Sequence, residues 1–260
     1  MSSNEPTKSK LAPELPHGEL QTVFENIWFV QGQVKMPMKL PAKISRSMTV
    51  LRDAQSGDLT LVNSMRLSKS GLDQLADLGP IKHVIRLGGF HGRDDLFYRE
   101  KFNAQVFAIQ GQSYSRSMEL SSDSENGYMQ PDVWVSSAEQ LPLSDCDLKI
   151  FTSSSPPEAA LLLKLHGGIL ITADSLQNTP APDQFVNFPM KLMMKKFGFW
   201  KAYNVGPGWL QFAKPSKNDV QSVMQLDFEH VLPGHGQAVI NDAKNKFAPV
   251  VNGELKGCHS

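Results

Sequence analysis

The segment Gly-Gly-Ile-Leu-Ile-Thr-Ala-Asp-Ser-Leu-Gln-Asn, residues 167–178, indicates how this 260-residue chain folds. Two glycines are followed by an apolar run of strand length, which ends at Asp174 and turn-forming residues. The length and the flanking residues favour a buried strand over a helix. An acid at the carboxyl end of a strand lies at the edge of the sheet, where sheet proteins commonly place ligands and metals. Asp174 is therefore a candidate ligand, although the same residue would also suit the start of an Asx-turn.

Other apolar runs predict that this strand belongs to a larger set. Residues 158–165 and 169–172 form a predicted hairpin around a histidine and two glycines. A second predicted hairpin joins residues 48–51 to residues 59–62 across a turn-forming cluster. The remaining predicted strands cover residues 21–31, 83–87, 103–109, 148–152 and 228–232.

Helices and loops are predicted between these strands. Residues 68–78 carry leucines at helical spacing behind Ser68 or Ser70, either of which can cap a helix. Asp94 or Asp95 suits the start of a short helix that ends at Phe102. Further helices are predicted for residues 185–200, 218–226 and 237–251, and loops for residues 32–42 and 110–132.

Two of these segments have more than one interpretation. A connection as long as residues 110–132 inside a compact domain is an active-site loop or an insertion. The segment 185–200 interleaves methionines and aromatic residues with Lys191, Lys195 and Lys196. It favours a helix that buries one face, and the alternatives are a methionine-rich lip over a pocket or a contact with a partner or a membrane surface.

The composition is ordinary for a soluble globular protein, and the length fits one domain of two packed layers or two small domains. Lysine and arginine together number 26, as do aspartate and glutamate, so no overall basic field favours nucleic acid. No apolar run approaches the length of a transmembrane helix. Cys146 and Cys258 are too few and too far apart for a disulfide framework or a thiolate cluster, which predicts a reducing, cytoplasmic compartment.

The polar ends divide the chain into three parts. Residues 1–20 contain prolines and lack the apolar core of a signal peptide, so we expect a disordered lead-in. Residues 21–251 form the predicted domain, and residues 252–260 form a predicted flexible tail. The sequence does not indicate an oligomeric state.

The seven histidines differ in their surroundings. His83 and His230 each open an apolar strand and are expected to be structural, and His166 falls in a predicted turn. His91 and His235 each follow a strand and have glycine neighbours, which let an imidazole approach a metal or ligand closely.

Together with Asp174, these two histidines give three loops at strand ends, each with a potential metal ligand. Asp94 and Asp95 add further candidates to the loop of His91. Two histidines and one or two aspartates suit zinc, iron or manganese. Each of these residues also has a turn-forming explanation, so spacing alone leaves the metal site and the ordinary turns open.

The order of three motifs resembles that of the metallo-β-lactamase-fold superfamily over roughly residues 21–250. Residues 231–236, Val-Leu-Pro-Gly-His-Gly, look like the loop that gives the family its last histidine ligand. Residues 170–175 look like its strand that ends in the bridging aspartate. Residues 91–96, His-Gly-Arg-Asp-Asp-Leu, lie where the family has His-x-His-x-Asp-His.

The resemblance implies an α+β fold, an αββα four-layer sandwich of two mixed β-sheets flanked by helices. It also implies one divalent metal, bound by His91, Asp95, Asp174 and His235, with zinc as the first choice and iron or manganese as alternatives. The first motif departs from the family's pattern, because Arg93 and Leu96 replace two histidines. A histidine expected before residue 158 and an acid expected after residue 62 are absent as well, and a chain that binds no metal is therefore the alternative.

Two functions follow from this resemblance. The first is a metal-dependent hydrolase that attacks an ester, thioester, amide or phosphoester of a small molecule with a metal-activated water, while Arg93 and Asp94 bind the substrate. The alternative is a catalytically inactive protein that binds a small molecule or a protein partner in the former active-site cleft. A guanidinium cannot ligate a cation, so Arg93 pointing into the site would favour the inactive protein.

Overall fold

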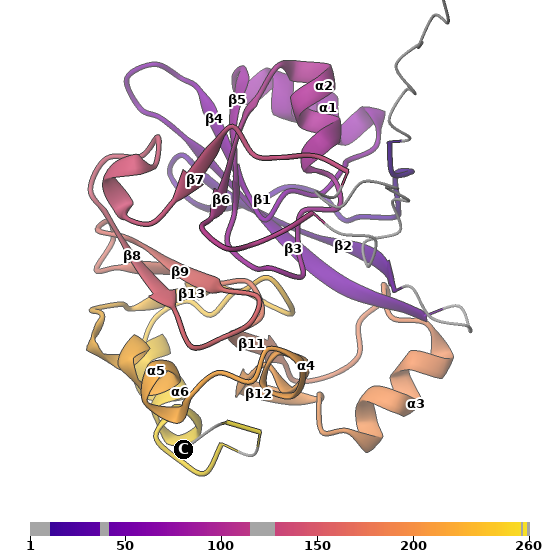
Figure 1. Cartoon of the computed structure of the whole chain (residues 1–260). Coiled ribbons are helices and arrows are strands. Elements are labelled where there is room, and N and C mark those ends of the chain that lie inside the picture. Colours follow the sequence, from indigo (N-terminus) through magenta and orange to yellow (C-terminus); the bar gives the residue numbers. More distant parts are fainter. Residues whose placement is uncertain (1–10, 37–41, 115–127, 256, 259–260) are drawn as a thin grey trace, which may run out of the picture.

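Two β-sheets lie face to face, and helices cover the outer side of each, in the computed structural model of the chain (Figure 1). The structure describes residues 11–36, 42–114, 128–255 and 257–258. The predicted αββα sandwich of two mixed sheets is therefore confirmed.

The first sheet has seven strands in sequence order, of which the first four are antiparallel and the last three add in parallel. Its strands are β1 (Gln21–Phe24), β2 (Ile27–Met36), β3 (Ala42–Arg52), β4 (Leu59–Val62), β5 (Ile81–Arg86), β6 (Gln105–Ile109) and β7 (Val133–Val135).

The second sheet has four strands in the order β13-β10-β9-β8, with β13 and β10 parallel and the other pairs antiparallel. These strands are β8 (Cys146–Phe151), β9 (Glu158–Leu163), β10 (Ile169–Ile171) and β13 (His230–Leu232). A separate two-stranded ribbon is formed by β11 (Leu176–Thr179) and β12 (Lys201–Val205).

The helices divide between the two outer faces, as Figure 1 shows. Those on the first sheet are α1 (Lys69–Leu78) and α2 (Asp95–Phe102), and those near the second are α4 (Pro207–Phe212), α5 (Lys217–Gln221) and α6 (Ala243–Val251). The helix α3 (Phe188–Lys196) projects beside the end of β3. Short 3-10 helices cover Ala138–Gln140 and Ser222–Gln225.

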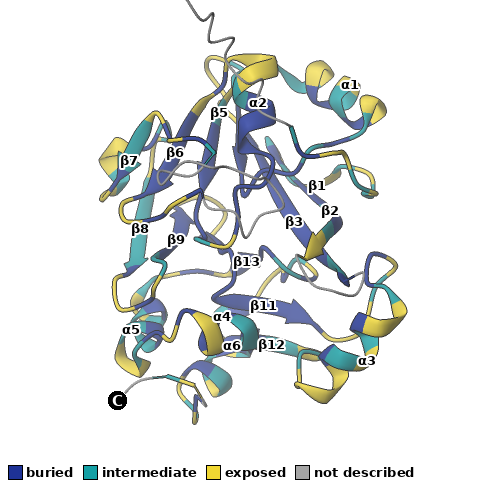
Figure 2. Ribbon diagram, turned by 45° about the vertical axis from the view of Figure 1, so that its right-hand side comes forward, coloured by how far each residue is buried: buried dark blue, intermediate teal, exposed yellow. Residues whose placement is uncertain are grey.

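Alternation along the strands explains the four layers. In β9, Leu161 and Leu163 pack between the two sheets, whereas Ala160 and Leu162 pack against the helices of the second sheet. A strand with both faces buried reads as a continuous apolar run, which is why the sequence of β9 and β10 shows no polar alternation. Figure 2 shows that burial is concentrated in the strands while the outer helices are exposed on one side.

Several predicted elements are present as expected. The hairpins β3–β4 and β9–β10 are both antiparallel pairs, and α1 begins after Ser68, whose hydroxyl accepts a hydrogen bond from the Gly71 amide. The helix that starts at Asp95 ends at Phe102, as predicted.

Other predictions were wrong at their boundaries. Residues 32–36 belong to β2 rather than to a loop, because they pair with β3 in a long antiparallel ladder; residues 37–41 lie outside the described residues. The last helix begins at Ala243 and not at residue 237, since Val239 still pairs with Val231. The strands β7, β11 and β12 and the helix α4 were not predicted.

The described ends of the chain pack against the domain. In the expected lead-in, Ala12 is buried, the Pro16 carbonyl accepts a hydrogen bond from Gln33, and Nε2 of His17 lies 2.9 Å from the Ser68 hydroxyl. In the expected tail, Leu255 is 9% exposed and packs with the helices of the second sheet.

The two cysteines are free, as expected. In the part of the chain that the structure describes, no helix has the length and apolar character that crossing a bilayer requires.

Candidate metal centre

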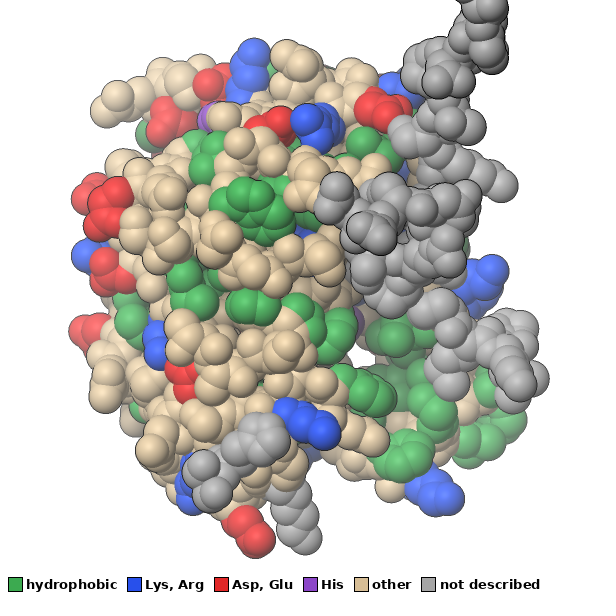
Figure 3. Space-filling model, in the orientation of Figure 1, with side chains coloured by type: hydrophobic (Ala, Val, Ile, Leu, Met, Phe, Trp, Pro, Cys, Tyr) green, Lys and Arg blue, Asp and Glu red, His purple; other side chains and the backbone are tan. Residues whose placement is uncertain are grey.

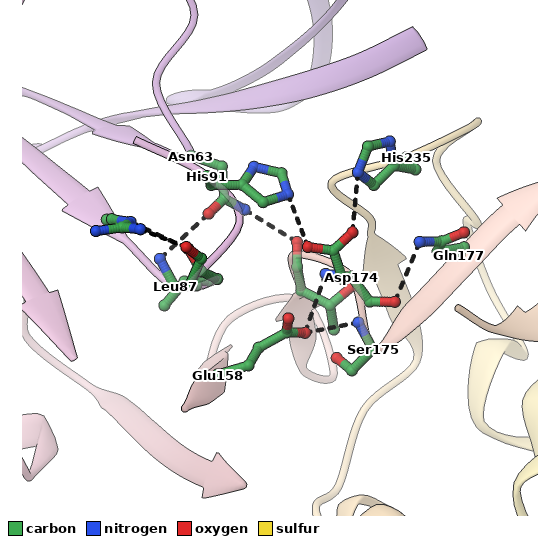
Figure 4. Close-up of polar contacts among 12 residues, drawn as sticks. Asn63, Leu87, His91, Glu158, Asp174, Ser175, Gln177 and His235 are labelled. Atoms are coloured by element: carbon green, nitrogen blue, oxygen red, sulfur yellow. Dashed lines mark hydrogen bonds and ion pairs between the residues drawn. The ribbon is translucent and has the colours of Figure 1, made fainter. Parts of the chain in front are cut away.

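Three of the side chains singled out from the sequence meet at one edge of the two sheets (Figure 4). Each of His91, Asp174 and His235 offers a nitrogen or oxygen atom, and these atoms lie within 4.8 Å of one another. The Nε2 atoms of His91 and His235 lie 3.3 Å and 3.1 Å from the two carboxylate oxygens of Asp174. All three side chains are largely buried, with 8–14% of their surface exposed.

The His91 ring lies in the loop between β5 and α2, where a buried arginine holds the backbone. Arg86 is fully buried and donates hydrogen bonds to the carbonyl oxygens of Gly88, Gly89 and Ser113. The amide of His91 in turn donates to the Gly88 carbonyl at 3.0 Å. Burial lowers the pKa of His91 below its ordinary value, and the charge of Asp174 offsets this only in part. A neutral imidazole, the form that binds a metal, is therefore favoured.

The Asp174 carboxylate follows β10 in a turn that Glu158 fixes. One oxygen of Glu158 accepts hydrogen bonds from the amides of Asp174 and Ser175, at 3.0 Å and 2.6 Å. Burial and the charge of Asp174 raise the pKa of Glu158 well above its usual range. For Asp174 itself, burial favours the neutral acid, but the two histidines outweigh it and hold the pKa well below the usual value. Asp174 is therefore the anion of the site.

The His235 ring lies in the turn after β13 and is oriented by the first sheet. Its Nδ1 atom lies 2.7 Å from the carbonyl oxygen of Ser45 on β3. A carbonyl oxygen only accepts hydrogen bonds, so Nδ1 carries the proton and Nε2 faces Asp174. Burial lowers the pKa of His235, but the hydrogen bond and charge of Asp174 outweigh burial and raise the pKa above its ordinary value.

These contacts fit a bound cation. In a neutral ring, Nε2 of His235 presents a lone pair to a carboxylate oxygen 3.1 Å away, which is repulsive unless the ring is protonated or a cation lies between the two atoms. The second oxygen of Asp174 is also buried and receives no hydrogen bond from the described residues, although His91 lies 3.3 Å away. Two imidazoles and a carboxylate are ligands that zinc, iron and manganese accept.

Gly236 determines the path of the turn that carries His235. Its φ is +91°, and a Cβ built on it would lie 2.0 Å from the backbone oxygen of Asn178. We expect Gly236→Ala to lower the free energy of unfolding by at least about 2 kcal/mol, because the turn must move. Gly198→Ala is the matched control: its φ is +72° with nothing within 4 Å, so only the backbone strain of about 1 kcal/mol should appear. If urea unfolding showed that both variants lose the same free energy of unfolding, this account would be contradicted.

Asp95, the fourth predicted ligand, does not belong to the group of three. Asp95 is the first residue of α2 and is fully buried. Both of its oxygens accept hydrogen bonds of 2.6 Å, from the hydroxyls of Ser64 and Tyr114. Burial raises the pKa of the Asp95 carboxyl, and the two hydroxyls lower it only in part.

Arg93 and Asp94, the predicted substrate contacts, pair with each other inside the protein. Nη1 of Arg93 lies 2.9 Å from one oxygen of Asp94, and its Nη2 donates to the Pro13 carbonyl at 3.1 Å. The other oxygen of Asp94 pairs with Arg46. The side chain of Arg93 is 2% exposed and that of Asp94 is fully buried. Arg93 is thus bound to Asp94 and not to the carboxylate of Asp174.

Sequence reasoning missed the residues that position the three candidate ligands, namely Ser45, Arg86 and Glu158. A signal was present for Glu158, which is the only charged residue of the apolar strand β9 and opens it. Asn63 was noted only as a missing acid, yet its amide donates to the Thr172 carbonyl, just after β10 of the second sheet, and its oxygen accepts from the Leu87 amide, just after β5 of the first. Figure 4 shows that Asn63 lies between the two sheets beside the ligands.

No protein-family model matches the sequence, and no curated protein matches it. Solved structures do. The mono-zinc form of the metallo-β-lactamase FIM-1 from Pseudomonas aeruginosa has a TM-score of 0.58 at 10% identity, covering 92% of this chain and 96% of its own. The metallo-β-lactamase from Erythrobacter litoralis, with β-mercaptoethanol in its active site, has a TM-score of 0.56 at 10% identity, and the match covers 90% of this chain and 95% of that one. The metallo-β-lactamase from Hirschia baltica has a TM-score of 0.53 at 12% identity, and the match covers 91% of this chain and 98% of that one.

The chain has the metallo-β-lactamase fold, as the resemblance of its motifs predicted. With identities of 10–12% to these structures, it is a divergent example of that fold. Fold alone does not fix the reaction, so the function must be argued from the site.

Proposed function

We propose that this protein is a hydrolase that uses one divalent metal, held by His91, Asp174 and His235. The convergence of these three side chains is the observation that carries the proposal. Three protein ligands leave a coordination position for water or substrate, the arrangement typical of catalytic zinc sites. The substrate classes are an ester, a thioester, an amide or a phosphoester of a small molecule.

Each residue of the site has a part in this chemistry. His91 supplies a neutral nitrogen, and Asp174 supplies a negative charge that offsets part of the charge of the cation. Ser45 keeps the proton of His235 on Nδ1, so that Nε2 is directed toward the metal. Glu158 fixes the backbone of Asp174 through two amides. A divalent cation bound there supplies a Lewis acid that activates water at neutral pH.

The placement of Arg93 supports the hydrolase over the inactive protein. Had its guanidinium lain beside Asp174, it would have replaced the cation by an internal ion pair. Instead Arg93 pairs with Asp94, and the atoms of the three ligands face one another. The replacement of two family histidines by Arg93 and Leu96 favours the alternative of a non-catalytic binding protein.

Metal binding is tested by thermal unfolding of protein purified without chelator or affinity metal. At a concentration 100 times its Kd, a metal that binds only the folded state stabilises it by about 2.7 kcal/mol and raises the Tm by about 5–10 °C. We expect this shift with zinc, iron or manganese, and none with His235→Ala. An unchanged Tm with all three metals would exclude the metal site.

Hydrolysis is tested separately with chromogenic esters, thioesters, amides and phosphodiesters, at equal concentrations of protein and added metal. We expect turnover of at least one class by the wild type and loss of this turnover in His235→Ala. Stoichiometric metal without turnover of any class would favour the non-catalytic binding protein.

A further inference from the structure

The helix α3 and the residues after it expose large apolar side chains to solvent. Among the described residues, three of the four most exposed large hydrophobic side chains lie here: Phe188 is 72% exposed, and Leu192 and Phe197 are each 57% exposed. Figure 3 shows hydrophobic side chains gathered in the region of α3. Exposed apolar side chains that cluster in this way mark an interaction surface. We call these three residues and the lysines around them the α3 face.

The fold does not require this second apolar face of α3. Met190 and Met194, four residues apart, are each 6% exposed and pack with Ala42. Phe188 and Leu192 are also four residues apart, and their high exposure places them on the opposite side of the helix. The helix therefore holds its position through the methionines, and the outer apolar residues remain available for another contact.

The charged residues of the segment that carries these side chains are of one sign. Between Asp183 and Asp219 the sequence has six lysines and no acidic residue, although the whole chain has equal numbers of both charges. On α3, Lys195 and Lys196 are exposed beside Leu192, and Lys201 is exposed at the start of β12. A surface of this charge attracts an anionic partner.

A hollow on the same surface combines both kinds of group. It has a volume of about 450 Å³ and is lined by Pro182, Lys191, Leu192, Lys195, Gly198 and Trp200. The indole of Trp200 is fixed there, because its Nε1 donates a hydrogen bond to the Lys191 carbonyl at 3.1 Å. Two ammonium groups beside an apolar floor suit a phospholipid, with its anionic headgroup at the lysines and its hydrocarbon against Leu192.

We propose that the α3 face docks the protein peripherally on an anionic phospholipid membrane. Amphipathic helices that lie in the membrane interface combine lysines on one part of the surface with phenylalanine, leucine and tryptophan on another. The cores of protein–protein interfaces, in contrast, are depleted in lysine, so the interleaved lysines favour a membrane over a protein partner. This proposal is independent of the metal site.

The test is sedimentation of the full-length protein with vesicles of phosphatidylcholine and phosphatidylserine, and with vesicles of phosphatidylcholine alone. We expect binding to the anionic vesicles that weakens as salt is added. The double variant Lys195→Gln with Lys196→Gln should weaken binding to these vesicles about 30-fold, because each lysine near an anionic surface contributes about 1 kcal/mol. Phe188→Gln with Leu192→Gln should weaken it at least about tenfold.

Matched variants elsewhere should not change vesicle binding. Leu165→Gln removes a hydrophobic side chain that is 48% exposed in the β9–β10 turn, and Lys69→Gln with Lys82→Gln removes two exposed lysines near α1 and β5. Equal binding to neutral vesicles, or undiminished binding by either α3 variant, would overturn the proposal. So would a dimer in sedimentation velocity that Phe188→Gln with Leu192→Gln dissolves, since the α3 face would then bind a second copy.

Discussion

Asp174→Asn is expected to weaken metal binding by more than about 100-fold, because even residues that only support metal ligands contribute up to about 100-fold. The asparagine keeps the size of the side chain but removes the charge that lies within 3.3 Å of both histidines. The measurements are metal content after dialysis and the affinity for zinc in competition with a chelating dye. Hydrolysis, where a substrate has been found, should fall with metal content.

Asp95→Asn is the matched control, since it makes the same change in a buried aspartate outside the group of three. It should retain the metal and lose about 1–3 kcal/mol of unfolding free energy, because one hydroxyl of Ser64 or Tyr114 loses its acceptor. The opposite pattern, with metal lost in Asp95→Asn and kept in Asp174→Asn, would show that the ligand set is wrong.

Asp94→Asn is expected to lower the free energy of unfolding by about 3–5 kcal/mol, with little effect on metal content. Asp94 is fully buried between the guanidinium groups of Arg46 and Arg93, and it also accepts a hydrogen bond from the Arg66 amide at 3.0 Å. Removing its charge leaves two buried arginines without their shared carboxylate. Urea unfolding, followed by circular dichroism, measures the loss.

The exposed pair of Lys69 and Asp73 provides the comparison for that result. Its side chains are 88% and 62% exposed, so Asp73→Asn should leave the unfolding curve unchanged. A stable Asp94→Asn variant with a higher KM for substrate would contradict the structural role of Asp94 and would support its role as a substrate contact.

The sequence predicted the site where a candidate ligand and the residues that shape its turn lie in the same short segment. The glycine-flanked apolar run before Asp174 and the glycines around His235 predicted both the strands and the turns that follow them. Local signals of this kind do not depend on which segments pack together, and the three side chains that meet were all among the candidates.

Other features depend on packing between distant segments. The last three residues of β11, Gln-Asn-Thr, are polar for a buried strand, and the strand pairs with β12 and hydrogen-bonds to the turn of His235. Spacing also could not tell that neither acid of the His91 loop joins the group of three. Asp94 pairs with Arg46 and Arg93, and Asp95, the first residue of α2, accepts hydrogen bonds from Ser64 and Tyr114.

The three proposed ligands are carried by two different sheets. His91 follows β5 in the first, whereas Asp174 and His235 follow β10 and β13 in the second. The distances among the three side chains therefore depend on how the two sheets are aligned across the apolar layer between them, which includes Ile85 and Leu161. A sliding movement of about 1 Å, too small to expose that layer, can cost about 100-fold in a reaction that needs aligned groups. If the proposed hydrolysis holds, volume-conserving substitutions in this layer should therefore lower turnover by a larger factor than their small cost in stability would suggest.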